Sequence, residues 1–440
     1  MTLLIENDLY QSIGTEMHSW ASDLFPINRS LTGNGVRETL KYVKKIIPEL
    51  TIKSVDSGVK VFDWEVPPEW RIREAWIKAP CGNKIVDFSS NNLHVIGYSE
   101  PVHKFIELKH LKSKLYSIPE KPDAIPYITS YYQRDWGFCL TDKQKKKLID
   151  GTYEVYIDSE FRQGYLNYGE VIIPGSTEKE IFISTYICHP SMANNELSGP
   201  VVATALARSV IKFSNRKFTY RFVFVPETIG SIAYLADHWQ SLKKNVVAGF
   251  NLTCIGDDRA YSFLPSRSEK SLADRVALKA LVDVSNNNVT RYSWLDRGSD
   301  ERQYCSPGID LPVASIMRSK YGTYPEYHTS LDDLNLVTPT GLEGGLKAVV
   351  NAIEILEHNF VPFTNILCEP QLGKRGLYES LSGVGESISS RTLINIISYC
   401  DGNNDILDIS NKLDLEFKTV YDLCNTLINF KILRRIESKI

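Results

Sequence analysis

One apolar run that ends in a histidine constrains this chain more than any other feature. Residues 181–188 read IFISTYIC, and His189 and Pro190 follow directly. A β-rich run closed by proline indicates a buried strand. Ligands of open α/β sheets bind in the crevice at the carboxyl ends of the strands. The run therefore predicts a strand that carries His189 into a cleft.

The chain around this run alternates between strand-like and helix-like segments. Such alternation predicts an α/β fold, with a mostly parallel sheet covered by helices on both faces. The expected strands are residues 171–173, 181–188, 218–225, 246–255 and 311–317, and the expected helices begin near residue 200 or span 271–284 and 341–358. Two further helices, 8–25 and 35–47, open the chain.

Composition changes twice along the chain and predicts three domains. Residues 59–159 are rich in aromatics, prolines and short alternating runs, which indicates an inserted β-rich domain. A catalytic domain would then consist of residues 1–58 and 160–362. After Pro362, three predicted helices (390–400, 406–413 and 417–429) and a β-like end resemble a winged helix, which makes residues 363–440 a third domain.

Charge and cysteine content exclude several classes of protein. The formal net charge of −3 provides no field that attracts nucleic acid or an anionic membrane. No apolar run approaches the ~20 residues that span a bilayer, and the first residues lack the pattern of a secretory signal, so we expect a cytoplasmic protein. The eight cysteines are scattered singly, which predicts reduced thiols and no zinc-thiolate site.

Three later stretches add polar groups to His189, and their order resembles a known family. Glu227 lies in VPETIGS, Asp300 lies in RGSD, and His328 lies in YHTSLDD. This order is similar to that of the co-catalytic zinc aminopeptidases, the clan of bacterial leucyl aminopeptidase and glutamate carboxypeptidase. The insert and the winged-helix tail resemble a bacterial aminopeptidase-like subgroup within it.

The resemblance implies roles for the matching residues. It makes His189 and His328 zinc ligands and Glu227 the general base that takes a proton from metal-bound water. Asp300 matches the Ser-Asp of the family, which supports the site from behind its ligands, and Tyr327 precedes the second histidine as in the family.

Three positions depart from the family pattern, and each replaces an anionic ligand by a neutral residue. Asn195 stands where the family has the bridging Asp, Thr228 replaces the second Glu, and Thr253 replaces the strand Asp. A metal pair is normally held by a bridging carboxylate and further anionic ligands. The sequence therefore favours one zinc ion over two.

A single zinc ion needs a third protein ligand beside the two histidines. Glu196, next to Asn195, is the first candidate, provided that a local bulge turns it inward. Asp257 and Asp258 are the second candidates.

Three arginines are candidates for substrate binding. Arg134 lies in the aromatic segment 131–139, which is interpreted either as a lid over the substrate or as a buried corner of the insert. Arg302 and Arg318 would meet a substrate carboxylate or form surface salt bridges.

Three functions are compatible with these features. The first is a metal-dependent, aminopeptidase-like hydrolase that cleaves an amide or peptide bond of a small peptide or amino-acid conjugate. The second is a catalytically inactive binding protein on the same fold. The third is a regulator that couples the cleft to DNA through the winged helix. Because residues 371–440 contain nine Lys or Arg and nine Asp or Glu, we favour a module for protein contact or self-association over DNA binding.

Overall fold

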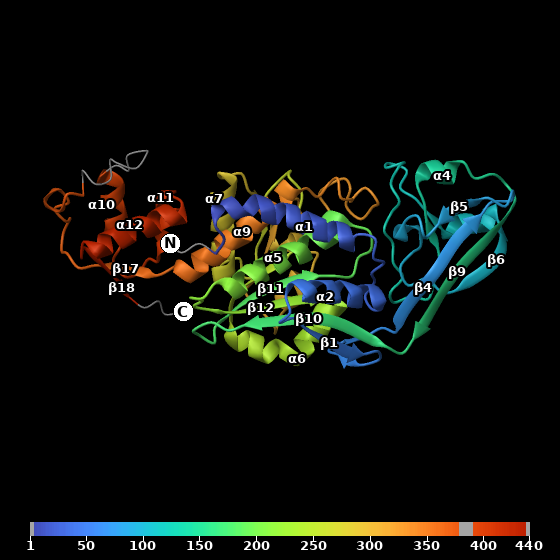
Figure 1. Ribbon diagram of the computed structural model, residues 1–440, viewed down its shortest axis with the longest axis horizontal. Helices are drawn as coiled ribbons and strands as arrows, with labels where there is room; N and C mark the ends of the chain where they lie inside the picture. Colours follow the sequence, from blue (N-terminus) through green and yellow to red (C-terminus); the bar gives the residue numbers. More distant parts are fainter. Residues whose placement is uncertain (1–3, 378–389, 437–440) are drawn as a thin grey trace.

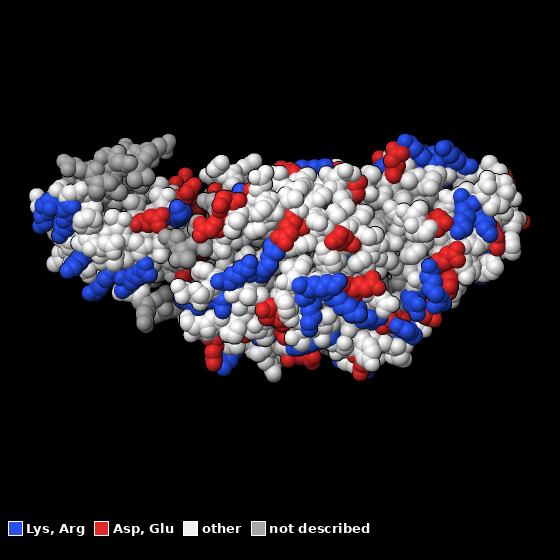
Figure 2. Space-filling view, viewed as in Figure 1, with Lys and Arg blue, Asp and Glu red and all other residues white. Residues whose placement is uncertain are grey.

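The three predicted parts of the chain lie in a row. The computed structural model describes residues 4–377 and 390–436. Figure 1 shows the large α/β unit in the middle, the β-rich insert at one end and the C-terminal helices at the other. Charges of both signs are intermixed over the middle of the face in Figure 2. In the described residues, no helix is long and apolar enough to cross a membrane.

An eight-stranded sheet forms the centre of the molecule. Its four middle strands are parallel, as predicted, whereas antiparallel pairs lie toward both edges. The parallel strands share one carboxyl-terminal edge, at which β11 delivers His189. The strands in order across the sheet are β1 (Thr51–Asp56), β10 (Tyr165–Ile173), β12 (Thr219–Val225), β11 (Glu180–Tyr186), β13 (Val246–Leu252), β16 (Val313–Met317), β14 (Ser262–Leu264) and β15 (Thr290–Arg291).

Helices cover both faces of this sheet, as expected for a buried sheet. Successive side chains of β11 point to opposite faces: Ile181 and Ile183 enter one apolar core and Phe182 enters the other. The first core is closed by α1 (Tyr10–Leu24), α2 (Asn34–Ile46), α5 (Ser198–Lys212), α7 (Leu272–Ser285) and α9 (Pro339–His358), and the second by α6 (Ile229–Asn245) and α8 (Glu301–Tyr304).

The insert is built on a four-stranded antiparallel sheet with its own apolar core. Its two long strands lead out of the central unit and back again (Figure 1). The sheet order is β5 (Lys84–Asp87), β4 (Glu69–Lys78), β9 (Thr152–Arg162) and β6 (Val102–Glu107), and short elements are α3 (Leu108–Leu111), β7 (Leu115–Tyr116), β8 (Phe138–Cys139) and α4 (Asp142–Lys146). A separate hairpin of β2 (Lys60–Val61) and β3 (Trp64–Glu65) lies against α6.

The C-terminal unit has the predicted winged-helix order of three helices followed by a strand. Its helices are α10 (Ser390–Ser398), α11 (Ile406–Leu413) and α12 (Phe417–Asn429), and β18 (Leu433–Ile436) pairs with β17 (Val361–Thr364). The unit is attached to α7 by polar contacts. Arg275 lies 2.7 Å from Asp408, and Lys279 donates a hydrogen bond of 2.6 Å to the carbonyl oxygen of Leu415.

Candidate functional site

The segment after β11 turns Glu196 inward through an irregular helical turn. Residues Ala193–Leu197 form a π-helix, the kind of one-residue bulge that is common at functional sites. Asp332 holds the start of this turn, because its carboxylate accepts the backbone N–H groups of Asn194 and Asn195 at 2.6 and 2.9 Å. The bulge that the sequence requires for Glu196 is therefore present.

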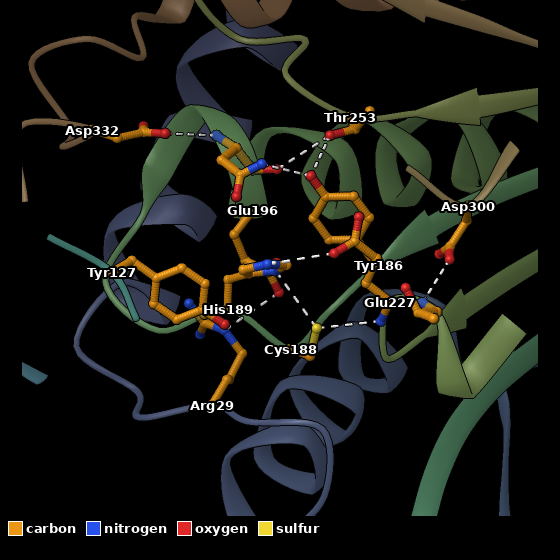
Figure 3. A network of polar contacts seen from close by, with 12 residues as sticks. Arg29, Tyr127, Tyr186, Cys188, His189, Glu196, Glu227, Thr253, Asp300 and Asp332 are labelled. Atoms are coloured by element: carbon orange, nitrogen blue, oxygen red, sulfur yellow. Dashed lines mark hydrogen bonds and ion pairs between the residues drawn. The ribbon is translucent and has the colours of Figure 1, made fainter. Parts of the chain in front are cut away.

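His189 lies between two carboxylates, as Figure 3 shows. Its Nδ1 is 2.9 Å from Oε2 of Glu196, and its Nε2 is 3.5 Å from Oε2 of Glu227. The Glu196 side chain is fully buried, whereas that of Glu227 is 22% exposed. Solvent or a ligand therefore reaches the Nε2 side of the imidazole and not the Nδ1 side.

A buried arginine fixes the closed side of His189. The Arg29 side chain is fully buried, its Nε donates a hydrogen bond of 3.0 Å to the carbonyl oxygen of His189, and the same Nε lies 3.7 Å from Oε1 of Glu196. A buried carboxylate is costly unless a cation or hydrogen bonds compensate it. Arg29 supplies part of that compensation across 3.7 Å, although Oε1 of Glu196 and Nη2 of Arg29 have no hydrogen-bond partner.

Glu227 is aimed into the site by a strained turn. Thr228 has φ 65° and ψ −80°, and the N–H of Ile229 donates to the carbonyl oxygen of Glu227 at 2.8 Å, which defines a γ-turn. A β-branched residue at positive φ is rare, and such strain clusters at functional sites. Asp300 accepts the Thr228 N–H at 2.7 Å, and Arg302 donates to the Thr228 hydroxyl at 2.6 Å. Thr228 thus serves the turn in place of a ligand.

His328 faces His189 under a tyrosine from the insert. The two imidazole centroids are 5.6 Å apart, and the Tyr127 ring lies 5.1 Å from each. The Tyr127 N–H donates to the carbonyl oxygen of His328 at 2.9 Å, and its hydroxyl is 2.7 Å from that of Tyr131. Tyr327 stacks on His328 at 3.9 Å. The insert therefore covers both histidines.

Asn195 and Thr253, two of the three neutral replacements, are connected through Tyr186. The Asn195 amide donates to the Tyr186 hydroxyl at 2.7 Å, and that hydroxyl is 2.5 Å from Oγ1 of Thr253. The Thr253 hydroxyl in turn donates to the carbonyl oxygen of Asn195 at 3.3 Å. All three residues are buried. These hydrogen bonds link the three residues where the resemblance places ligands for a second ion, and they leave Oδ1 of Asn195 buried without a hydrogen-bond partner.

The second candidates for a carboxylate ligand have structural partners instead. Asp257 accepts hydrogen bonds from the Asn194 amide, the Arg259 N–H and both the N–H and hydroxyl of Ser319, at 2.7 to 2.9 Å. Asp258 accepts a hydrogen bond from the Thr338 hydroxyl at the start of α9.

The remaining candidates divide into two groups. Arg302 joins the site through Thr228. Arg318 instead lies over the Tyr261 ring at 3.9 Å, and Arg134 lies over the Phe161 ring at 3.8 Å. Arg134 lines a small pocket with Tyr131, Tyr132 and Phe161.

Burial shifts the two imidazoles and three carboxyl groups of the site toward their neutral forms. It lowers the pKa of His189 and of His328 to about 3. It raises the pKa of Glu196 to about 8 against the opposing effect of Arg29, and it raises that of Asp300 to about 7 against hydrogen bonds from Thr228 and Ser231. Burial and the nearby Asp300 carboxylate raise the pKa of Glu227 well above its usual value. Two neutral imidazoles beside carboxylates are the donor set of a metal site.

Two groups of these donors are candidates for holding a metal ion, and they differ in whether they leave a coordination position open. Cys188, His189 and Glu196 bring ligand atoms within 4.8 Å of one another, but all three residues are buried, and Cys188 already accepts the Glu227 N–H at 3.2 Å. That cluster leaves no open coordination position. On the Nε2 side, two ligands of one tetrahedral zinc ion would lie ~3.4 Å apart. The 3.5 Å between His189 and Glu227 fits this spacing, whereas the His328 ring centroid is 5.6 Å from that of His189, and these three side chains do not bring their ligand atoms within 4.8 Å of one another.

Sequence reasoning missed four residues of the site. Tyr186 and Cys188 are in the apolar run, where their side chains look like ordinary core. Tyr127 lies just before the aromatic segment singled out in the insert, and Arg29 stands in a polar stretch typical of a surface. Only their contacts with His189 and its neighbours, seen in Figure 3, identify them.

Comparison with known proteins agrees with this architecture. Residues 18–359 match a family described as "Domain of unknown function (DUF4910)", and residues 361–435 match a winged helix-turn-helix family. A Clostridium acetobutylicum protein named "Putative polysaccharide biosynthesis protein with aminopeptidase-like domain" is 42% identical over 96% of this chain and 97% of its own length. A crystal structure of a "putative peptidase" from Clostridium acetobutylicum has a TM-score of 0.90 at 40% identity, over 98% of both chains.

More distant structures share the fold of the central unit. A zinc aminopeptidase from Bacillus subtilis has a TM-score of 0.57 at 14% identity and covers 78% of this chain and 94% of its own. A peptidase M28 precursor from Shewanella amazonensis has a TM-score of 0.54 at 13% identity, over 80% and 97% of the two chains. The central unit thus has the aminopeptidase fold, and the chain belongs to the DUF4910 family, with a winged-helix domain at its C-terminal end.

Proposed function

We propose that this protein is a metal-dependent amide hydrolase that uses one zinc ion. The observation that carries this proposal is the pair of neutral imidazoles, His189 and His328, with Glu227 at 3.5 Å from the exposed side of one of them. Two histidines and one glutamate with an open fourth position are a recognised catalytic zinc set. The aminopeptidase fold of the central unit supports the same reading.

In this proposal Glu227, and not Glu196, is the third ligand. Glu196 contacts Nδ1 of His189 and lies beside the Arg29 guanidinium. A carboxylate in this position orients a metal-bound histidine through the ring nitrogen that does not bind the metal. An ionised Glu196 accepts the Nδ1–H and leaves the lone pair of Nε2 for the ion. Glu196, the ligand that the sequence predicted first, therefore supports His189 in this proposal instead of binding the ion.

The other residues of the site position the Glu227–Thr228 turn and limit the access of water. When bound, a zinc ion would polarise the amide carbonyl and lower the pKa of a water molecule. Asp300 supports the turn that carries Glu227, because its Oδ1 accepts the Thr228 N–H at 2.7 Å and the Ser231 hydroxyl at 2.8 Å. Tyr127 restricts water around the two imidazoles, and Arg302 positions the Glu227–Thr228 turn.

The substrate we propose is an amide within a sugar-containing molecule. The 42% identical relative is named for polysaccharide biosynthesis together with an aminopeptidase-like domain. The aminopeptidase fold supports an amide or peptide bond as the bond that is cleaved. A sugar that carries an acyl or aminoacyl group on nitrogen has such a bond within a saccharide.

Zinc analysis of the full-length protein tests the proposal. We expect about one zinc per chain and hydrolysis of at least one member of a panel of N-acyl and N-aminoacyl amino sugars. The double variant His189→Ala, His328→Ala should lose both. His103→Ala is the matched control, since this histidine is 57% exposed on the insert and pairs with Glu154. Zinc retained by the double variant would refute the metal assignment.

One observation favours an alternative, a binding protein without catalysis. Asn195 and Thr253 are neutral and are hydrogen-bonded through Tyr186 at positions where the resemblance places metal ligands, as expected of a site that has lost its metal, although Oδ1 of Asn195 has no hydrogen-bond partner. In that case the wild type would contain no zinc after growth in zinc-supplemented medium, and substitutions at His189 would change only ligand affinity.

A further inference from the structure

A second concave surface lies beside the candidate site and has no role in the proposed chemistry. It is a groove of about 400 Å³ between the β2–β3 hairpin and helix α6, which we call the hairpin groove. This volume falls within the roughly 300–1,000 Å³ of small-molecule sites. Its lining includes Phe62, Asp63, Trp64, Trp239, Gln303 and Ser306.

The hairpin groove shares two elements with the candidate site. Helix α6 begins directly after Thr228 of the strained turn, and Ile232 and Trp239 line the groove further along the same helix. At about 1.5 Å of rise per residue, these two positions lie ~6 and ~16 Å along the helix axis from Thr228. Arg302 bonds to Thr228, and the next residue, Gln303, lines the groove. The groove thus shares helix α6 and the short helix α8 with the turn that carries Glu227.

The tip of the hairpin holds a strained, exposed aromatic residue over the groove. Strand residues Val61 and Trp64 pair with each other, so Phe62 and Asp63 form a two-residue loop. Phe62 has φ 56°, a backbone conformation that is an outlier for a bulky residue and that glycine adopts freely. Its side chain is 56% exposed. A two-residue hairpin loop requires a positive φ at its first residue, so the turn accounts for the backbone of Phe62, whereas packing does not account for its exposed ring.

The chemistry of the lining fits one class of ligand. Phe62, Trp64 and Trp239 present aromatic rings, whose negative faces attract the polarised C–H groups on one face of a sugar ring. Asp63, Gln303 and Ser306 add donors and acceptors for hydroxyl groups at the same surface. We infer that the hairpin groove binds the saccharide part of the substrate, next to the site at which its amide is cleaved. This assignment rests on the proposed function for its biological role, but its binding test does not.

The test measures binding in a protein that has lost the proposed zinc ligands. Isothermal titration uses the full-length double variant His189→Ala, His328→Ala with three probes: N,N′-diacetylchitobiose, cellobiose and leucyl-leucinamide. We expect saturable binding of at least one disaccharide. Trp64→Ala and Phe62→Gly in this background should each weaken it about tenfold, the size of one aromatic contact. Phe105→Ala is the control, because Phe105 is 71% exposed on the insert, away from the groove lining.

The Phe62→Gly variant tests the assignment most directly, because its stability and its disaccharide binding are expected to respond differently. Because glycine suits φ 56°, this variant should unfold at the same temperature as its parent or a higher one while binding the disaccharide more weakly. Binding of the leucine probe alone, binding that neither substitution weakens, or no binding of either disaccharide would each overturn the saccharide assignment. None of these results bears on zinc content or on amide hydrolysis, which test the proposed function separately.

Discussion

Replacing Glu196 by Gln separates the two roles that a carboxylate beside His189 can have. If Glu196 supports His189 from behind, the amide oxygen of Gln still accepts the Nδ1–H that the carboxylate now holds at 2.9 Å. Charge-assisted hydrogen bonds contribute about 1.5–3 kcal/mol and neutral ones about 0.5–1.5 kcal/mol. The variant should therefore lose about 1.4 kcal/mol of zinc binding, roughly tenfold in affinity, in keeping with the ~10- to 100-fold effect of such partners.

Glu227→Gln should cost much more. A four-ligand zinc site is worth about 10–16 kcal/mol, or roughly 3 kcal/mol per ligand, so loss of an anionic ligand should weaken zinc binding more than ~100-fold. Competition for zinc with a chromophoric chelator measures both variants. The opposite order, with zinc lost in Glu196→Gln and kept in Glu227→Gln, would refute our assignment and restore the sequence prediction of a Glu196 ligand and a Glu227 base.

Folding must be controlled in this comparison, because Glu196→Gln leaves Arg29 buried without its anion. Breaking a buried ion pair on one side costs about 3–5 kcal/mol of stability, and this cost applies where Glu196 is ionised, which is above about pH 8 in zinc-free protein or at lower pH once a bound cation favours ionisation. The double variant Glu196→Gln, Arg29→Met removes both charges together and should recover part of that loss. Circular dichroism of each variant then confirms that zinc affinities are compared between folded proteins.

Three further predictions address the surroundings of the site. In zinc-free protein, the raised pKa of Glu196 should lower stability in urea as the pH rises from about 4.5 to 8, whereas the lowered pKa values of His189 and His328 act in the opposite direction below about pH 6.5, so the difference between wild type and Glu196→Gln should isolate the Glu196 contribution. Asn195→Asp should leave zinc at about one per chain by elemental analysis, because Thr228 and Thr253 remain neutral; a second equivalent would contradict this. The full-length protein should not shift duplex DNA at physiological salt, although Lys and Arg gather at the outer end of the winged-helix unit (Figure 2), because Lys418 on α12 lies 3.8 Å from Asp422; a salt-dependent shift would show otherwise.

The sequence was sufficient for features that depend on chain order alone. The apolar run that becomes β11 predicts a strand end at His189, and parallel strands place their carboxyl ends at one edge, so Glu227 and His189 were expected together. Which side of His189 each carboxylate takes depends on the π-helix at residues Ala193–Leu197 and the γ-turn at Thr228. Neither turn has a sequence signature strong enough to read.

Arg29 and Tyr127 lie beyond such reasoning because distant segments bring them to the site. Arg29 lies 160 positions before His189 in the chain, and Tyr127 comes from an insert that folds around its own core. No local pattern states that a loop of that core will hydrogen-bond to the backbone of His328. Residues that reach a site from distant segments are therefore harder to predict from the sequence than residues at the ends of its strands.

The charges around His189 explain why three neutral replacements are compatible with a functional site. In the arrangement that the resemblance implies, two divalent cations balance the buried carboxylates. Here the replacements remove three of those carboxylates, and Arg29, fully buried beside Glu196, supplies a permanent cation for one that remains. Glu227 and Asp300 are left with raised pKa values and no buried cation in direct ion-pair contact among the described residues. In the proposed single-zinc site, one divalent ion would offset the charge of this pair once both groups are ionised, and of the two only Glu227 reaches the open side, because Asp300 is fully buried.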